Sequence, residues 1–381
     1  MSQTLTFYPL GNAETCLLEL GNGAKLLFDY AAMYDGSTTD TRYDIKKELS
    51  TIKEFDVVMF SHAHDDHTHG ASEFFYLDHA KAYQSESRAK IKELWVSAAF
   101  LLDTDLENQS DAKIIRAEAR HRLKNKYGIK VFAEPDSLEK WLTDHEIDYD
   151  DVSDLIIHAG QVINLPDSLN EEMQVFVHAP FSDDSEDIQD KNDPSLVLQV
   201  RLFNNERETN LLITGDTPYQ VLDKIVDISQ ANSNESFLAW DIYDIPHHCS
   251  YTGLNEKGEK AVRIITPTDN VQWLLEQATT NAHMVASCLK ITEETSPPHM
   301  CAKRAYEKYT SPDVKFLATM EHIPFSGGKP TPIKFVIDSF GVTLKQDRMQ
   351  EVYFKKSPLE QGSNRRKKWI THVKLLLLQI S

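Results

Sequence analysis

Short apolar runs separated by polar turns fill the first half of the chain, and they predict β-strands. Runs of four to eight residues with β-branched or aromatic character are typical of buried strands. The dipeptide Asn22-Gly23 is a strong hairpin signal between the second and third runs. The strands predicted in this half cover residues 5–8, 15–20, 25–30, 57–60, 94–97 and 129–132.

Longer segments with helix-like patterning lie between some of these runs. The predicted helices cover residues 43–55, 71–88, 108–127 and 137–143. The third of them has a partial apolar stripe that includes Ile114, Ile115 and Leu123, and Gly128 is placed to end it. Lys and Arg occupy much of the rest of this helix, so we expect it to be basic.

The second half returns to strands, and several of them end in a residue that can bind a metal. The predicted strands cover residues 174–178, 195–200, 210–217, 242–245, 284–288, 316–319 and 332–337. His178 ends the first of these strands, and Asp216 lies at the end of the third. Pro297-Pro298-His299 opens a helix that runs through Tyr309, because proline suits the first helical turn.

The most unusual polar segment is residues 61–67, Ser-His-Ala-His-Asp-Asp-His, which leaves the fourth predicted strand. Neutral imidazole and ionised carboxylate suit a borderline divalent ion such as zinc. His62 and His64 lie two apart and can point to one side, whereas Asp66 and His67 are adjacent and diverge. One loop can therefore supply two metal positions at the spacing that two-metal hydrolases use. A chance polar loop explains such a density of polar groups poorly.

The pattern His-x-His-x-Asp-His resembles the signature of the metallo-β-lactamase superfamily of hydrolases. Residues 246–250, Pro-His-His-Cys-Ser, are similar to the Pro-His-His-Gly-Ser element of the branch typified by the hydrolase domain of ComEC-type DNA-uptake proteins. Cys249 replaces the glycine of that element. The resemblance covers roughly residues 5–338 and implies an α/β fold, a four-layer αββα metallo-β-lactamase-like sandwich.

The same resemblance sets the expected domain boundaries. We expect a hydrolase domain over residues 1–345, with a helical insertion at residues 103–170. The C-terminal extension, residues 346–381, is partly basic and partly apolar.

The resemblance also implies two divalent metal ions, with zinc expected first and manganese as the alternative. The implied ligands are His62, His64 and His178 for the first metal, Asp66, His67 and His248 for the second, and Asp216 as the bridge. Asp29 ends a predicted strand and is implied to support the metal loop rather than to bind metal.

Three residues are candidates for catalysis beside the metals, namely Asp66, His247 and His299. Asp66 is the natural proton acceptor, and His299 would donate to an oxyanion; the alternative for His299 is a capping or surface residue. His247 and His248 both follow Pro246, and adjacent side chains on an extended backbone point to opposite sides. We therefore expect only one of the two to face the second metal directly, unless the turn is sharply bent, and we prefer His248.

The charge of the chain changes what this centre can act on. The formal net charge is −19, and residues 134–193 carry 18 acidic side chains against two lysines, a net of −16. Residues 113–130 carry seven Lys and Arg against Glu118, a net of +6. Both stretches are either solvated surface or functional: a basic helix near the metals and an acidic surface elsewhere. Lys113, Arg116 and Arg120 recur at helical spacing and would share one face.

A phosphodiester, either a nucleotide or nucleic acid, is the substrate that these features favour. The net charge of −19 would repel a long polyanion, whereas a small nucleotide or another small ester avoids that objection. The alternative is a metal-binding, partner-dependent or regulatory subunit of a multi-protein assembly that docks through residues 134–193 or the tail. The sequence contains no stretch of about twenty apolar residues, so we expect no membrane span. Four scattered cysteines suit a reducing compartment, so we expect a cytoplasmic location.

Overall fold

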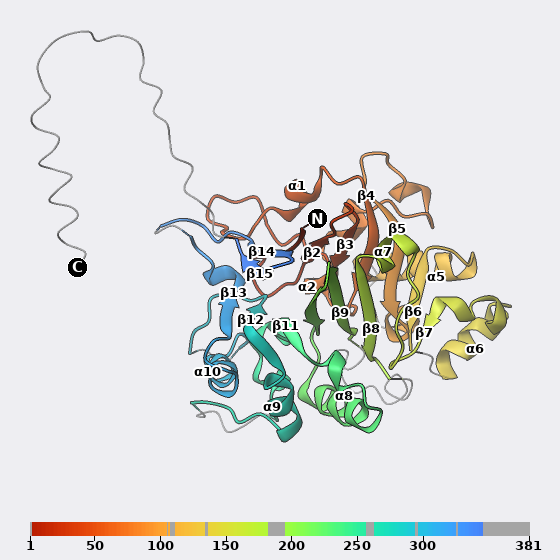
Figure 1. Ribbon diagram of the computed structural model, residues 1–381. Helices are drawn as coiled ribbons and strands as arrows, with labels where there is room; N and C mark the ends of the chain where they lie inside the picture. The colour runs from red at the N-terminus through yellow and green to blue at the C-terminus, as the bar shows by residue number, and fades with distance from the viewer. Residues whose placement is uncertain are drawn as a thin grey trace, which may run out of the picture. The chain divides into compact units, whose positions relative to one another are not determined.

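Two β-sheets and the helices on their outer faces make up the computed structural model of the protein (Figure 1). It describes residues 2–104, 106, 111–133, 136–181, 195–256, 263–293, 296–324 and 327–345. Residues 1–346 group into one compact unit by their contacts. The C-terminal extension, with the docking role predicted for it, lies outside the described residues.

The first sheet contains nine strands within the described chain. In spatial order they are β15 (Gly341–Leu344), β14 (Ile333–Asp338), β1 (Gln3–Phe7), β2 (Cys16–Glu19), β3 (Lys25–Phe28), β4 (Glu54–Phe60), β5 (Lys90–Ser97), β6 (Ile129–Phe132) and β7 (Ile156–Ile157). Pairing is antiparallel from β15 to β3 and parallel from β3 to β7. The carboxyl ends of β4 and β5 therefore meet at one edge, with Phe60 beside Val96.

The second sheet contains six strands of the described chain. Their order is β13 (Lys315–Ala318), β12 (Ala278–Ala286), β11 (Trp240–Asp244), β10 (Arg207–Ile213), β9 (Val197–Asn204) and β8 (Met173–Ala179). The strands from β10 to β13 are parallel, so their carboxyl ends also share one edge. The strands β8, β9 and β10 are antiparallel.

Ten helices are described around these sheets. They are α1 (Ile45–Leu49), α2 (Asp65–Thr68), α3 (Ala71–Phe74), α4 (Ala98–Leu102), α5 (Asp111–Lys124), α6 (Asp136–Asp144), α7 (Asp167–Asn170), α8 (Tyr219–Ala231), α9 (Asp269–Leu275) and α10 (Met300–Tyr309). None of the described helices is long and apolar enough to cross a membrane.

Three apolar clusters hold these elements together in layers. The cluster between the sheets joins side chains of both, among them Met59 on β4 and Val200 on β9. A second cluster packs the outer face of the first sheet under α3 and α5, and a third packs the other sheet under α8, α9 and α10. Strand residues alternate between the clusters, as Val58 and Met59 do, because successive side chains point to opposite faces. The predicted four-layer αββα sandwich is confirmed.

Two details of the predicted elements differ from the structure. The helix predicted over residues 71–88 is wrong beyond α3, because Phe75 leaves the helix in an extended conformation and pairs with Ala89. The helix predicted over residues 43–55 is confined to α1. The expected insertion, residues 103–170, contributes α5, β6, α6 and β7, so it lengthens the first sheet as well as adding helices.

Candidate metal centre

The candidate metal ligands lie on loops at the carboxyl ends of strands from both sheets. The loop after β4 and helix α2 carry His62, His64, Asp66 and His67. The loops after β10 and β11 carry Asp216 and the pair His247-His248. Ligand sites of open α/β sheets commonly form where carboxyl strand ends meet. Residues far apart in the sequence are therefore brought to one place by the topology.

Among the described residues, four groups of side chains are close enough to hold a metal ion, and two overlapping ones consist of predicted ligands alone. In each group, one ligand atom from every member lies within 4.8 Å of those from the others. One group is His62, His64 and Asp66, and the other is Asp66, His67, Asp216 and His248. The structure thus brings together six of the seven predicted ligands.

Asp216 lies at the centre of these residues. Its Oδ1 is 3.2 Å from Nε2 of His67 and 3.6 Å from Nε2 of His248. Its Oδ2 is 3.7 Å from Nε2 of His62. Nε2 of His248 is also 3.1 Å from Oδ2 of Asp66. One carboxylate therefore presents its two oxygens to two sets of imidazoles, as a bridging ligand requires.

The outer nitrogens of the three imidazoles around Asp216 are held by the protein. Nδ1 of His62 lies 3.0 Å from Oγ of Ser61. Nδ1 of His67 lies 2.8 Å from Oδ2 of Asp29, and Nδ1 of His248 donates to the carbonyl oxygen of Ser287 at 2.8 Å. Asp29 also accepts from the backbone N–H of Ser61 at 2.7 Å, so it supports the metal loop as predicted. Such bonds fix the ring orientation and leave Nε2 for a metal.

Two observations test whether these residues fit a metal ion. Nε2 of His62 is buried and has no hydrogen-bond partner in the described chain, and buried nitrogens are rarely left so. The charges of the cluster are also unusual. Burial by itself would lower the pKa of His67 and of His248. Asp216 and Asp29 nevertheless raise the pKa of His67 well above its usual value. Asp216 and Asp66 raise the pKa of His248 to about 9. The carboxylates thus demand positive charge at this place, which a divalent ion would supply.

The loop that carries His247 and His248 has a left-handed backbone. His247, His248 and Cys249 have φ angles of 50°, 52° and 62°, and none of them is glycine. Such conformations cost free energy and cluster at functional sites. Hydrogen bonds from His247 N to Gly215 O (3.1 Å) and from Ser250 N to His247 O (2.8 Å) hold the turn.

This bent turn is the exception to the expectation that only one of the two histidines faces the second metal directly. That expectation assumed an extended backbone, and the assumption is wrong here. Nε2 of His247 lies 3.9 Å from Oδ2 of Asp216, while His248 approaches the other oxygen. His247 is the more exposed of the two, at 26% of its side-chain surface against 4%. Both rings therefore approach the same carboxylate.

Two of the predicted site residues lie elsewhere in the structure. His178 belongs to neither group of candidate ligands: its Nε2 lies 3.0 Å from the carbonyl oxygen of Phe237, and burial lowers its pKa to about 4. His299 holds the left-handed turn, because its backbone N–H donates to Cys249 O at 3.0 Å. Its Nδ1 accepts from Tyr251 N at 3.4 Å.

A buried pair of carboxyl groups beside the candidate metal centre was missed from the sequence. Burial and the neighbouring Asp244 raise the pKa of Glu14 well above its usual value, and burial raises that of Asp244 to about 7. The backbone N–H of Glu14 also donates to Asp66 O at 3.0 Å. The signal that could have revealed the pair is Asp244, an acidic residue inside the apolar strand β11.

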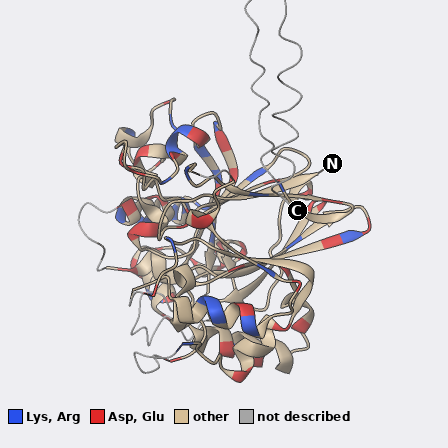
Figure 2. Cartoon of the chain, turned by 90° about the vertical axis from the view of Figure 1, so that its left-hand side faces the viewer, with Lys and Arg blue, Asp and Glu red and all other residues tan. Residues whose placement is uncertain are grey.

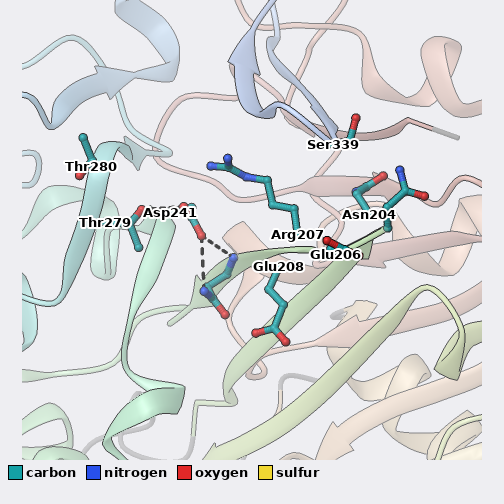
Figure 3. Close-up of a pocket in the computed structure, with 10 residues that line it drawn as sticks. Asn204, Glu206, Arg207, Glu208, Asp241, Thr279, Thr280 and Ser339 are labelled. Carbon is teal, nitrogen blue, oxygen red and sulfur yellow. Dashed lines mark hydrogen bonds between the residues drawn. The ribbon is translucent and has the colours of Figure 1, made fainter.

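A polar groove lies at the opposite end of the second sheet (Figure 3). It is formed at the amino ends of β10, β11 and β12, and Arg207 and Asp241 are among the residues that line it. Asp241 Oδ2 accepts from the backbone N–H of Asn210 at 2.7 Å, and Oδ1 accepts from Thr279 Oγ1 at 2.6 Å. Both oxygens of Asp241 are thus bonded to other residues that line this groove.

Charges on the described surface are mixed rather than segregated. Both Lys or Arg and Asp or Glu occur on the helices (Figure 2). The acidic stretch predicted as a partner surface is described for residues 136–181 only, so residues 134–135 and 182–193 lie outside the described residues. Docking through it stays a prediction.

No family model matches the chain, and no curated protein sequence matches it. The chain is similar to solved structures of metallo-β-lactamase-fold proteins. One is a subclass B3 metallo-β-lactamase from a soil metagenome library, with 10% identity and a TM-score of 0.30 over 63% of this chain and 75% of that one. A dizinc quorum-quenching lactonase has 15% identity and a TM-score of 0.24 over 59% and 67%. A long form RNase Z from yeast has 9% identity and a TM-score of 0.32 over 91% of this chain and 50% of that one.

Proposed function

We propose that this protein is a metal-dependent hydrolase with two divalent ions, and that its substrate is a phosphodiester. The observation that carries the proposal is the arrangement around Asp216. Nε2 atoms of His62, His67 and His248 surround its two oxygens, and in all three rings Nδ1 has a partner in the protein. Zinc is the metal that this mixture of imidazole and carboxylate suits first, and manganese is the alternative.

Each proposed metal position draws on a different part of the site. His62 and His64 would hold the first ion, with His178 as the third ligand expected from the sequence. Asp66, His67 and His248 would hold the second, and Asp216 would bridge. Bound ions of this kind lower the pKa of a water molecule. They also polarise an oxygen of the substrate group that the water attacks.

The side chains beside the metals would move the protons. His248 and the other neighbouring charges keep the pKa of Asp66 low although burial opposes them, so Asp66 is ionised at neutral pH and able to orient the attacking water. His247 is partly exposed, and its Nδ1 lies 3.2 Å from Oγ1 of Thr252. Its Nε2 faces the centre and would hold the proton that the leaving oxygen needs. His299 would act by holding the turn that carries both histidines.

A phosphodiester is supported by the motif resemblance and by the basic helix α5. A nucleotide-sized substrate fits the net charge of −19 better than a long nucleic acid does. A cytoplasmic location remains the expectation from the four free cysteines.

Hydrolysis of bis-p-nitrophenyl phosphate by the full chain tests this function directly. We expect turnover that a chelator abolishes and that zinc or manganese restores. Asp216→Ala should lose at least a hundredfold in rate, and Asp241→Ala serves as the matched control because it removes an aspartate at the other end of the same sheet. A wild-type rate that the chelator leaves unchanged would contradict the proposal. Faster hydrolysis of p-nitrophenyl acetate than of the phosphodiester would keep the hydrolase and reject the substrate class.

A further inference from the structure

Helix α5 carries three arginines, and their guanidinium groups differ greatly in how many hydrogen bonds they make to the protein. Arg122 is fully buried and fully used: it donates to Glu118 Oε1 at 2.7 Å, to Gly128 O at 2.9 Å and to Ile91 O at 3.1 Å. Arg120 donates to Leu101 O at 2.8 Å. Both are structural residues that tie the helix to neighbouring strands and helices.

Arg116 lies one turn before Arg120 and differs from both. Only 9% of it is exposed, and no hydrogen bond or ion pair joins its guanidinium to any residue that the structure describes. Its Nη1 is buried without a partner. A buried cation with unused donors is costly unless a charge of opposite sign accompanies it. Arg116 thus retains its capacity to bind an anion.

The position of Arg116 relates it to the candidate metal centre. Helix α5 packs against α2, which carries Asp66 and His67, and against α4, which leaves β5 beside the metal loop. Asp111, the first residue of α5, accepts from the backbone N–H groups of Gly70 and Ser72 at 2.9 Å each, just after the metal loop. Arg122 bonds to residues at the opposite edge of the sheet. The helix therefore runs away from the metal edge, and Arg116 lies in its half nearer to the metals.

The electrostatic surroundings of Arg116 favour an anion further. Burial lowers the pKa of Arg120, and the positive charge of Arg116 lowers it too, so the two guanidinium groups act on each other. Asp103 acts on Arg120 in the opposite direction. A planar guanidinium binds a phosphate group through two parallel hydrogen bonds, and phosphate carries up to two negative charges.

We propose that Arg116 binds a phosphate group of the substrate other than the one that is hydrolysed. This inference rests on the proposed function for the identity of the ligand as substrate, and it narrows the substrate to a phosphodiester that carries a second phosphate. Glu118 lies on the same helix, but it accepts from Arg122 and His79 and does not neutralise Arg116.

The first test measures thermal unfolding of chelator-treated protein with inorganic phosphate, so that it depends on neither bound metal nor turnover. We expect phosphate to raise the Tm of the wild type by about 2–4 °C at saturation, while acetate at equal ionic strength does not. Arg116→Met should abolish this shift, and it should raise the Tm of the ligand-free protein because an unpaired buried charge is removed. Arg116→Gln is the second variant, should the first fail to fold.

Lys124→Met is the matched control, since it removes one positive charge from the exposed end of the same helix. It should keep the phosphate shift. An undiminished shift in Arg116→Met or Arg116→Gln would overturn the proposal, as would a wild type that phosphate does not stabilise. If acetate raised the Tm as much as phosphate does, the site would be one for anions in general. That result would overturn the proposal that its ligand is a phosphate group.

The second test uses turnover of a phosphodiester that bears an additional terminal phosphate. Arg116→Met should raise its KM about tenfold or more, and added salt should weaken the wild type more than the variant. Loss of kcat at unchanged KM would overturn a binding role. If neither protein hydrolyses any phosphodiester but the phosphate shift depends on Arg116, the proposed function fails and the anion site stands.

Discussion

The two ends of the second sheet use aspartate in opposite ways. Asp241, at the amino end of β11, gives its oxygens to Asn210 and Thr279. Asp216, at the carboxyl end of β10, faces the Nε2 atoms of histidines from both sheets. Hydrogen bonds within the sheet occupy the oxygens of Asp241. The oxygens of Asp216 face imidazole nitrogens and can bind a cation together with them. The difference supports placing the proposed metal centre at the carboxyl end of the sheet.

Backbone conformation divides the same two ends. The left-handed turn at residues 247–249 lies at the carboxyl end and is made of non-glycine residues. Strain of this kind persists where the surrounding structure holds it, and it is concentrated at functional sites. Here it brings His247 and His248 to the two oxygens of one carboxylate, which an extended backbone would not do.

The largest expected effect separates the two histidines of that turn. His248→Ala should lose about one metal per chain and nearly all activity, because it removes a buried Nε2 from both Asp66 and Asp216. His247→Ala should keep its metals and lose about a hundredfold in rate, the scale of one general acid or oxyanion donor. Metal content and kcat of both variants measure this. Because the turn brings both rings to Asp216, metal loss in His247→Ala instead would exchange the two roles.

Asp241→Ala should affect stability rather than metal. Removing this carboxylate leaves the N–H of Asn210 and the hydroxyl of Thr279 without their acceptor, at a cost of about 1–3 kcal/mol in the free energy of unfolding. Urea unfolding measures the loss, and metal content is the control readout. A change in metal content would show that the two ends of the sheet are coupled.

The smallest expected effect concerns Cys249, which is buried in the left-handed turn. Alanine keeps the strained φ, whereas glycine relieves it, so Cys249→Gly should be more stable than Cys249→Ala by about 1 kcal/mol. Cys288 is a matched buried cysteine without a positive φ, and there alanine should be the more stable replacement. Urea unfolding of the four variants compares the two positions. If the alanine variant were the more stable at both positions, the turn would store no strain.

The sequence predicted those parts of the site that are contiguous or that follow a strand. His62, His64, Asp66 and His67 lie in one loop, so their proximity needed no knowledge of the fold. Asp216 and His248 were placed through a motif resemblance, and the parallel order of the strands accounts for their meeting. His178 stays a prediction as a metal ligand, since in the structure it bonds to Phe237.

Other features depend on packing and could not be predicted from patterns along the chain. The handedness of the turn at Cys249 follows from bonds to Gly215 and His299, which lie far from it in sequence. Burial raises the pKa of Glu14, and so does Asp244 on β11, which lies far from it in sequence. Charge counting described α5 as basic, but only the structure shows that Arg122 is satisfied while Arg116 is not.

Metal content of the purified full chain tests the central claim most directly. After reconstitution with zinc or manganese and removal of excess metal, we predict about two ions per chain by elemental analysis. Asp216→Ala should lose metal from both positions because it removes the shared carboxylate, whereas Asp241→Ala should retain about two. A wild type that binds no metal, or an Asp216→Ala variant that binds as much as the wild type, would contradict the account.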